Sequence, residues 1–238
     1  MAEIPGSGFP IIQRHSPALS RSVESSQTIP PNRTSCSSVV HIGDSTSEGL
    51  VSSDYLPKRS QRLPSQFARV GATHQHLEIT GATSIVETLP GGTNAYDVAR
   101  RLVANGYHGC WVLALGTNDA ADVYVGSTIS LATRIERMMS VIGNQPVLWV
   151  NAKSLVSSGP YSESDMQNWN NALTAACSKY PNMRVFDWAA MARDAWFIPD
   201  GIHYTSPGYA ARAHLIANAL ARAFPSSDPA GSLGCVVR

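Results

Sequence analysis

The sequence predicts an α/β fold in which helices cover both faces of a five-stranded parallel sheet. Short apolar runs alternate with longer amphipathic segments along the middle of the chain. The runs are almost uninterrupted in apolar residues, which is typical of strands that are buried on both faces. Polar clusters follow most of these runs, and ligand sites in such folds lie beyond the carboxyl ends of the strands. Together these observations predict a doubly wound domain.

Five apolar runs are the expected strands. They are Ser38–Gly43, His76–Thr80, Cys110–Leu115, Pro146–Asn151 and Met183–Trp188. They are near-continuous apolar runs, and they alternate with helical segments along the chain. The runs therefore suit a parallel sheet.

The amphipathic segments are the expected helices. They are Asn94–Asn105, Ile129–Ile142, Ser162–Tyr180 and a last helix that begins near Ser206. Ser162 is followed three residues later by Asp165, which resembles a capping box. Pro207 suits the first position of the last helix.

Composition divides the chain into three parts. Residues 1–37 are rich in Ser and Pro and are expected to form an extended N-terminal arm, residues 38–225 to form the folded domain, and residues 226–238 to form a C-terminal tail. The first residues lack the basic and apolar regions of a signal peptide. We therefore expect either that a leader is absent or that the chain is part of a longer protein.

Charge and motifs exclude several classes of function. The net charge is +1, so we expect no nucleic-acid partner. No apolar run approaches the roughly 20 residues of a membrane span. The sequence contains no zinc-protease, Walker or dinucleotide-binding motif, so neither a metal site nor a cofactor is expected.

Three residues predict a nucleophilic site. Ser45 follows the first strand on a turn into a helix, where its hydroxyl would be exposed. A serine hydroxyl needs a base, and His203 is the expected one. Asp200 lies three residues before His203 and can reach back to orient the imidazole.

Ser45, Gly81 and Asn118 are expected to form an oxyanion hole, from two backbone N–H groups and one side-chain amide. Two alternatives stay open here. The pair at 91–92 competes with Gly81 for its role, and Asn118 could be a simple turn residue.

The remaining polar residues near these clusters have structural interpretations. Asp44 is expected to cap the helix after the nucleophile, and Asp119 to brace its loop. His41 lies within a strand and is expected to be structural. Ser47 and Glu48 could contact substrate, but cap chemistry explains them equally well.

Four blocks carry a family resemblance. HIGDSTSEGL contains Ser45, ITGATS contains Gly81, LGTND contains Asn118, and DGIHYTSPGYAARA contains Asp200 and His203. In this order the blocks resemble those of the SGNH hydrolases, also called the GDSL esterase/lipase superfamily. The resemblance extends over residues 38–224. It implies a three-layer α/β/α flavodoxin-like fold, metal-independent ester hydrolysis and no cofactor.

The last block is similar to SGNH domains that act on acyl groups of cell-envelope glycans, some of them fused to acyltransferase-3 membrane proteins. The resemblance implies an acylated glycan or small molecule as substrate, a membrane acyltransferase as a partner or fusion, and an extracytoplasmic location. We expect a serine esterase that forms an acyl-enzyme on Ser45. The segment Thr46–Leu63 is short and polar, so short acyl chains are expected. An acyltransferase using the same serine, or a non-catalytic glycan- or lipid-binding domain, remains an alternative.

Four cysteines allow three connectivities if all of them pair. By topology Cys36, Cys110, Cys177 and Cys235 should all lie near the rim opposite the active site. We expect at least one disulfide there, and the expected pairing is Cys36–Cys235, which would clamp the two termini.

Overall fold

The computed structural model describes residue 1, residues 33–227 and residues 234–238. Contacts divide the chain into two units, Met1–Pro30 and Pro31–Arg238. All helices and strands given below belong to the second unit. The expected arm therefore lies largely outside the described residues.

Within the described residues the sheet has six strands in the order β2-β1-β3-β4-β5-β6, and all neighbouring strands pair in parallel. Their bounds are β1 Ser38–Gly43, β2 His74–Ile79, β3 Cys110–Ala114, β4 Val147–Val150, β5 Met183–Phe186 and β6 Val236–Val237. The expected parallel α/β sheet is confirmed. The expected number of five strands is wrong, because two residues of the predicted tail return to the sheet as β6.

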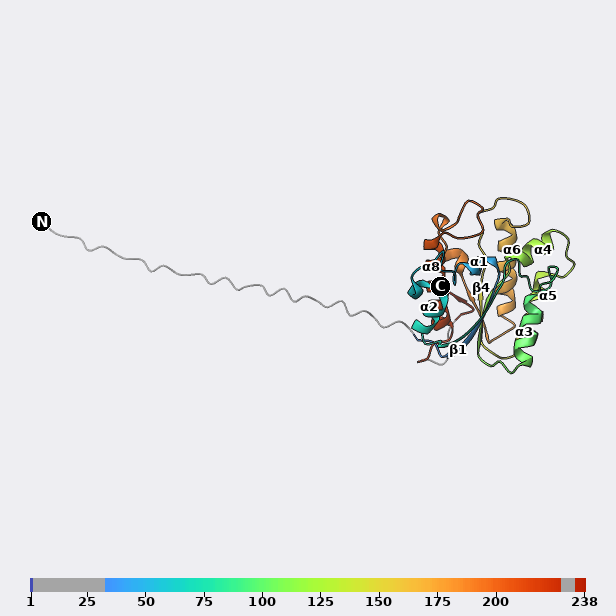
Figure 1. Ribbon diagram of the computed structural model, residues 1–238, viewed down its shortest axis with the longest axis horizontal. Coiled ribbons are helices and arrows are strands. Elements are labelled where there is room, and N and C mark those ends of the chain that lie inside the picture. Colours follow the sequence, from blue (N-terminus) through green and yellow to red (C-terminus); the bar gives the residue numbers. More distant parts are fainter. Residues whose placement is uncertain (2–32, 228–233) are drawn as a thin grey trace. The chain divides into compact units, whose positions relative to one another are not determined.

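Helices lie on both faces of the sheet (Figure 1). The α-helices are α1 Ser45–Glu48, α2 Leu63–Arg69, α3 Ala95–Ala104, α4 Thr117–Tyr124, α5 Leu131–Ile142, α6 Glu163–Cys177, α7 Trp188–Met191 and α8 Ser206–Ala223; two 3₁₀ turns are η1 Arg59–Gln61 and η2 Asp194–Trp196. The four expected helices are present as α3, α5, α6 and α8. The Ser162 side chain caps α6 by accepting from the backbone N–H of Asp165, as expected.

Two hydrophobic cores hold the three layers together. Side chains alternate between the faces of the strands, so Val39 packs toward α2 and α8 while Val40 packs toward α3, α5 and α6. Trp111 and Trp149 are fully buried in the second core. Because β1, β3 and β4 are covered on both faces, their carboxyl ends are held rigidly at one edge of the sheet.

The folded domain extends beyond the expected bounds of 38–225. Thr34 forms an antiparallel bridge with Pro225, and its backbone N–H donates to the Val70 carbonyl at 2.8 Å. Cys36 is buried. Residues just before β1 and just after α8 are thus packed side by side.

Two disulfides are present: the N-terminal disulfide, Cys36–Cys110, and the C-terminal disulfide, Cys177–Cys235. The expectation of at least one disulfide is confirmed, but the pairing Cys36–Cys235 is wrong. The reason is strand order. β1 lies beside β3 with Val39 opposite Cys110, so Cys36, two residues before β1, meets the first residue of β3. Cys235 precedes β6 and meets the end of α6 instead.

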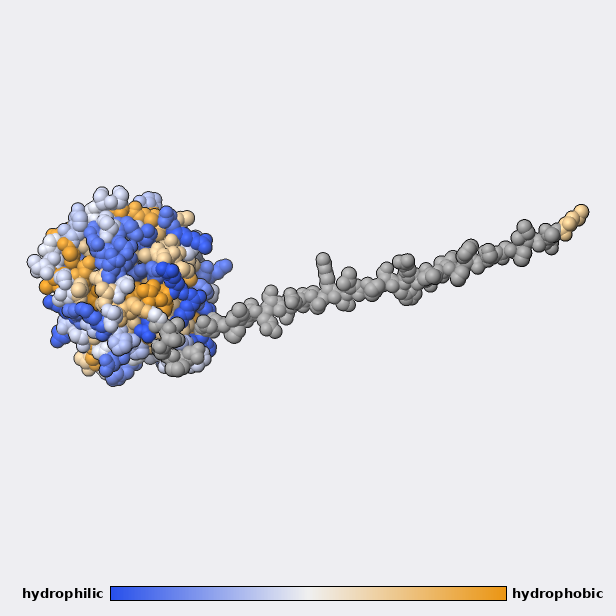
Figure 2. Space-filling view, turned by 180° about the vertical axis from the view of Figure 1, so that it is seen from behind, coloured by the Kyte–Doolittle hydropathy of each residue, from blue (hydrophilic) through white to orange (hydrophobic). Residues whose placement is uncertain are grey.

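Exposed large hydrophobic residues are scattered over the described surface. They are Met1, Tyr55, Leu89, Tyr124, Val125, Leu155 and Val236. Hydrophilic and hydrophobic residues are mixed over the face of the domain seen in Figure 2. None of the described helices combines the length and the apolar character that a membrane span requires.

Candidate active site

Ser45 is the first residue of α1 and is separated from the end of β1 by Asp44 alone. Asp44 caps this helix: its Oδ1 accepts from the backbone N–H of Thr46 at 2.9 Å and from the Thr46 hydroxyl at 2.7 Å. A Cβ on Gly43 would lie 2.4 Å from the Ser47 Oγ, so the tight turn requires glycine there. The strand end and the cap together present the Ser45 hydroxyl at the rim of the sheet.

Asp200 and His203 lie in the loop before α8. The Asp200 Oδ1 accepts from the backbone N–H groups of Ile202 at 2.9 Å and of His203 at 3.0 Å. The other carboxylate oxygen, Oδ2, lies 2.7 Å from the His203 Nδ1. Burial raises the pKa of Asp200, but these hydrogen bonds outweigh it and leave the pKa below its usual value. The carboxylate therefore shapes the loop and orients the imidazole.

The structure brings the three side chains into one chain of contacts. The His203 Nε2 lies 2.8 Å from the Ser45 Oγ, although the two residues are 158 positions apart in the sequence. The imidazole and the Asp200 carboxylate remain partly accessible, with 33% and 40% of their side chains exposed. This is the arrangement in which a histidine can take a proton from a serine hydroxyl.

Gly81 lies beside Ser45. A Cβ built on Gly81 would come within 3.9 Å of the Ser45 Cβ and 3.0 Å of the Glu48 Oε1. A Cβ on Gly91 would meet no atom within 4 Å, and the neighbours of Gly92 come from Leu89 alone. Between the two sequence alternatives, the structure thus places Gly81 next to Ser45.

The Asn118 amide is held at the start of α4. Its Nδ2 donates to the Thr83 carbonyl at 3.0 Å, and its Oδ1 lies 3.5 Å from the Tyr161 hydroxyl. Because the amide nitrogen carries two hydrogens, the bond to Thr83 leaves one for a ligand. Asn118 is only 9% exposed, so its orientation is fixed by these neighbours.

Asp119 contacts the loop after β2 rather than its own loop. Its Oδ1 accepts from the backbone N–H of Ile85 at 2.9 Å and from the Arg134 guanidinium at 3.0 Å. Arg134 also binds Glu87 through both terminal nitrogens. The sequence analysis did not single out Arg134 or Glu87, because the partners are 47 residues apart.

His41 and Ser47 form a second imidazole–hydroxyl contact at 3.2 Å, but both are fully buried. Burial, together with the charge of Arg212, lowers the pKa of His41 to about 3. A neutral imidazole without access to solvent fits the structural role expected for His41. Glu48, in contrast, is exposed and lies against Gly81 at the mouth of the site.

A buried cation lies beneath the site and was not anticipated. Arg212 of α8 is 3% exposed, and its guanidinium reaches the Thr46 hydroxyl at 3.4 Å and the Tyr204 hydroxyl at 3.3 Å. It also stacks over the Trp188 ring at 4.9 Å. Thr46 follows Ser45 and Tyr204 follows His203, so Arg212 contacts both loops from below.

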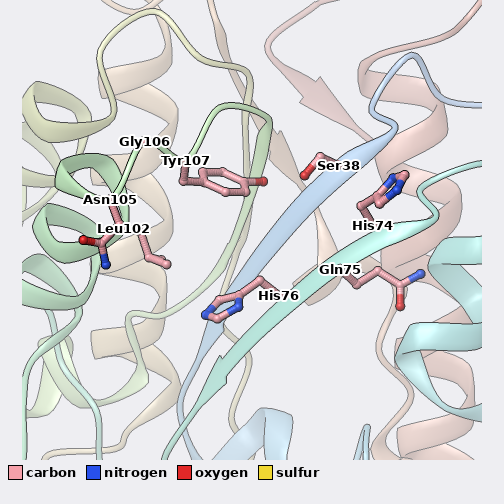
Figure 3. Close-up of a pocket in the computed structure, with 8 residues that line it drawn as sticks. All are labelled: Ser38, His74, Gln75, His76, Leu102, Asn105, Gly106 and Tyr107. Atoms are coloured by element: carbon pink, nitrogen blue, oxygen red, sulfur yellow. The ribbon is translucent and has the colours of Figure 1, made fainter.

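A separate pocket of about 330 Å³ lies at the other end of the sheet. The beginnings of β1 and β2 and the end of α3 line it, with His76 and Tyr107 among the residues shown in Figure 3. The run of β1 separates Ser38 in this pocket from Ser45 by roughly 20 Å. The pocket is therefore distinct from the serine site.

Among the described residues, no group of three or more His, Cys, Asp or Glu side chains is placed so that it could bind a metal ion.

The sequence model described as "GDSL-like Lipase/Acylhydrolase family" matches residues 41–211. The chain belongs to the GDSL-like lipase/acylhydrolase family. The match includes Ser45, Gly81, Asn118, Asp200 and His203. A search of curated proteins finds no match to the chain.

Solved structures share the fold of this GDSL-like domain. A carbohydrate acetylesterase family member from Sinorhizobium meliloti has a TM-score of 0.59 at 16% identity, and the match covers 76% of this chain and 95% of that one. The lipase/acylhydrolase from Enterococcus faecalis has a TM-score of 0.56 at 16% identity, covering 81% and 99%.

The third similar structure is a transferase. The C-terminal catalytic domain of peptidoglycan O-acetyltransferase A from Streptococcus pneumoniae has a TM-score of 0.54 at 15% identity, covering 78% of this chain and 91% of that one. The predicted α/β/α SGNH fold is confirmed, and the chain is an enzyme of the GDSL/SGNH hydrolase class.

Proposed function

We propose that the chain is a serine esterase that removes short acyl groups, of the size of acetyl, from cell-envelope carbohydrate through an acyl-enzyme on Ser45. The observation that carries the proposal is the contact chain from the Ser45 Oγ to His203 at 2.8 Å and from His203 to Asp200 at 2.7 Å. A hydroxyl, a base and an orienting carboxylate in this order can perform acyl transfer.

In the first step the Ser45 Oγ attacks the ester carbonyl carbon, and its proton passes to the His203 Nε2. The Asp200 carboxylate accepts from Nδ1–H and stabilises the imidazolium that forms. The negative oxygen of the tetrahedral intermediate is bound by the N–H groups of Ser45 and Gly81 and by the Asn118 amide. When the intermediate collapses, the alcohol leaves with the proton from His203.

The second step releases the acyl group. Water enters the site left by the alcohol, gives a proton to His203 and attacks the acyl carbon. The second tetrahedral intermediate then collapses, the proton returns to the Ser45 Oγ, and the carboxylic acid departs. Atoms balance with one water consumed for each ester cleaved.

The substrate class rests on two observations. Two of the similar structures are described as a carbohydrate acetylesterase family member and a peptidoglycan O-acetyltransferase domain. The segment after the nucleophile is short, consisting of α1, η1 and brief connections, and its Glu48 carboxylate lies at the mouth of the site. A charged mouth favours hydroxylated carbohydrate over long apolar chains.

The two disulfides support an extracytoplasmic location, because such bonds persist in oxidising compartments. In that setting the substrate would be a glycan of the cell envelope.

Transfer is the second candidate function, favoured by the fold similarity to the O-acetyltransferase domain. In this reaction a sugar hydroxyl replaces water in the second step and leaves as the acylated sugar. A membrane acyltransferase, as partner or fusion, would supply the acyl group. Incubation with an acyl donor and an oligosaccharide, followed by mass spectrometry, separates acylated sugar from free acid.

Turnover of nitrophenyl esters of increasing chain length tests the proposal. We expect the highest kcat/KM for acetyl or propionyl esters and its loss in Ser45→Ala. Ser47→Ala is the matched control, since Ser47 lies two residues away but is buried against His41. Equal turnover by wild type and Ser45→Ala would overturn the assignment of the nucleophile, and a preference for long chains would overturn the substrate class.

A further inference from the structure

The loop between β2 and α3 carries one of the three donors of the proposed oxyanion hole and orients a second. Gly81 lies in this loop, and so does Thr83, whose carbonyl accepts from the Asn118 amide. The loop contains no helix or strand of its own. Its position relative to Asn118 must therefore come from contacts with the neighbouring helices.

One buried guanidinium supplies two of these contacts, both to Glu87, and also binds Asp119, which supplies another through Ile85. The Arg134 side chain, on α5, has 0% exposure. Its Nη2 donates to the Glu87 Oε1 at 2.6 Å, and its Nη1 donates to the Glu87 Oε2 as well as to the Asp119 Oδ1 at 3.0 Å. A bidentate pair of this kind fixes both distance and orientation. Arg134 thus joins the β2–α3 loop, through Glu87, to α4, through Asp119.

The remaining donors of Arg134 are also used. Nε donates to the Ile129 carbonyl at 3.1 Å, and Nη2 donates to the Ser127 Oγ at 2.8 Å. The side chain therefore has a single well-defined position, which it can impose on its partners.

The contact between the β2–α3 loop and α4 depends on the positive charge of Arg134. Glu87, Asp119 and Asp122 all face Arg134 within 4 Å. Burial pushes the pKa of Glu87 upward, but hydrogen bonds from Arg134 and Ser127 outweigh it and lower that pKa to about 2. Burial raises the pKa of Asp119 to about 7. Without the guanidinium the carboxyl groups would repel one another or take up protons, and the loop would lose its anchor.

We propose that Arg134 is a positioning residue for the oxyanion hole, because it fixes the loop that carries Gly81 against the helix that carries Asn118. The inference rests on the proposed function. Arg134 touches no reacting atom. It acts through Asp119, which is adjacent to Asn118 and accepts from Ile85 in the same loop. Three of its bonds converge on the two segments that must stay in register for both donors to meet one oxygen.

Kinetics of Arg134→Lys, Arg134→Gln and Glu87→Gln test the inference. Displacing an oxyanion donor by about 1 Å can cost roughly 100-fold in rate. We expect kcat to fall by about 10- to 100-fold with KM changed less than about threefold, because the hole acts on the transition state. Arg134→Lys should not keep the kcat of the wild type, since an ammonium group cannot bind the Glu87 carboxylate in a bidentate way.

A tetrahedral mimic provides the readout that a general loss of structure would not give. Phenylboronic acid forms a tetrahedral adduct on a nucleophilic serine, and its affinity should fall by the same factor as kcat. Arg100→Gln is the matched control, because Arg100 forms a similar but exposed pair with Asp97 on α3. Thermal melting and near-UV circular dichroism establish that each variant is folded at the assay temperature.

The outcomes separate the two proposals. If the turnover of the wild type did not depend on Ser45, the proposed function itself would be wrong. A folded Arg134→Gln variant with the kcat of the wild type would overturn the positioning role alone. So would a fall in kcat without a matching fall in the affinity for phenylboronic acid. Should the Arg134 variants not fold, Glu87→Gln decides, because the Glu87 side chain is 37% exposed and tolerates substitution better.

Discussion

Replacing Asp200 with asparagine separates the two tasks that this carboxylate performs. Oδ1 accepts from two backbone N–H groups and holds the loop, whereas Oδ2 accepts from the His203 Nδ1–H. In Asp200→Asn the single amide oxygen can keep the backbone bonds. The amide NH₂ then faces Nδ1, which must become an acceptor. The imidazole proton moves to Nε2, where it points at the Ser45 hydroxyl and prevents proton transfer.

The expected loss is large and specific. A wrong tautomer in a triad of this type lowers kcat by about 10⁴-fold, or roughly 5 kcal/mol of activation free energy. Stability should change by less than about 1 kcal/mol, because the loop bonds survive. Asp200→Ala is the comparison, because it loses the loop hydrogen bonds as well. Its free energy of unfolding should be lower than that of Asp200→Asn, whereas its kcat should be no lower.

Hydrolysis of nitrophenyl acetate measures kcat and KM, and urea unfolding measures stability in the same preparations. The reasoning fails if Asp200→Asn retains more than about a tenth of wild-type kcat, since a histidine held in the wrong tautomer cannot act as a base.

Three further predictions concern the scaffold. Replacing both cysteines of the N-terminal disulfide with alanine frees a loop of sequence separation 74, which should lower the free energy of unfolding by up to about 4 kcal/mol; a change below about 1 kcal/mol in urea unfolding would contradict this. The pKa of His41 is about 3 in the folded state and 6.5 in the unfolded state, so below pH 6.5 only the unfolded state takes up the proton. The contribution of His41 to stability is therefore present above pH 6.5 and is lost as the pH falls toward 3. Between pH 6.5 and 4.5 the wild type should lose about 2–3 kcal/mol more than His41→Gln, and parallel stability curves would refute the assignment. Gly116→Ala should be far more destabilising than Gly126→Ala: both glycines have positive φ, at 126° and 110°, but only the Cβ at 116 would collide with a side chain, at 2.0 Å from the Trp169 Nε1. Equal melting temperatures for the two variants would exclude that collision.

Apolar patterning predicted most of the sheet because four of the five expected strands are covered on both faces. β3 and β4 are buried at every position, and the sequence shows this directly. β6 was missed for the opposite reason. Two valines are too short a pattern to indicate a strand, and only pairing with β5 gives them a place in the sheet.

The sequence singled out Ser45, Asp200 and His203, which the structure brings together, because they fall in short, ordered blocks. It did not single out the residues that support them. Arg134 lies in a helix whose polar positions look solvent-facing, and its partner Glu87 lies in a loop without periodicity. Arg212 lies in the apolar face of α8 and binds residues from two other segments. Such contacts depend on the tertiary arrangement, which single-sequence patterns do not encode.

The predicted disulfide pairing was wrong for a related reason. Strand order decides which cysteines meet, and the order β2-β1-β3 places the chain before β1 next to the start of β3. The sequence analysis instead assumed that the two ends of the chain meet each other.

The short strand β6 has a consequence for how the molecule behaves at high concentration. A sheet edge offers free N–H and C=O groups to any other extended chain, and this is a common route to aggregation. One edge, β2, is lined with polar residues such as His76 and Glu78. At the other edge, the Cys235 and Val237 carbonyls accept from the backbone of β5 and the residue after it. The C-terminal disulfide ties this cover in place. Colloidal behaviour is thereby linked to redox state: under reducing conditions the β5 edge can open, and the protein becomes vulnerable to edge-to-edge association.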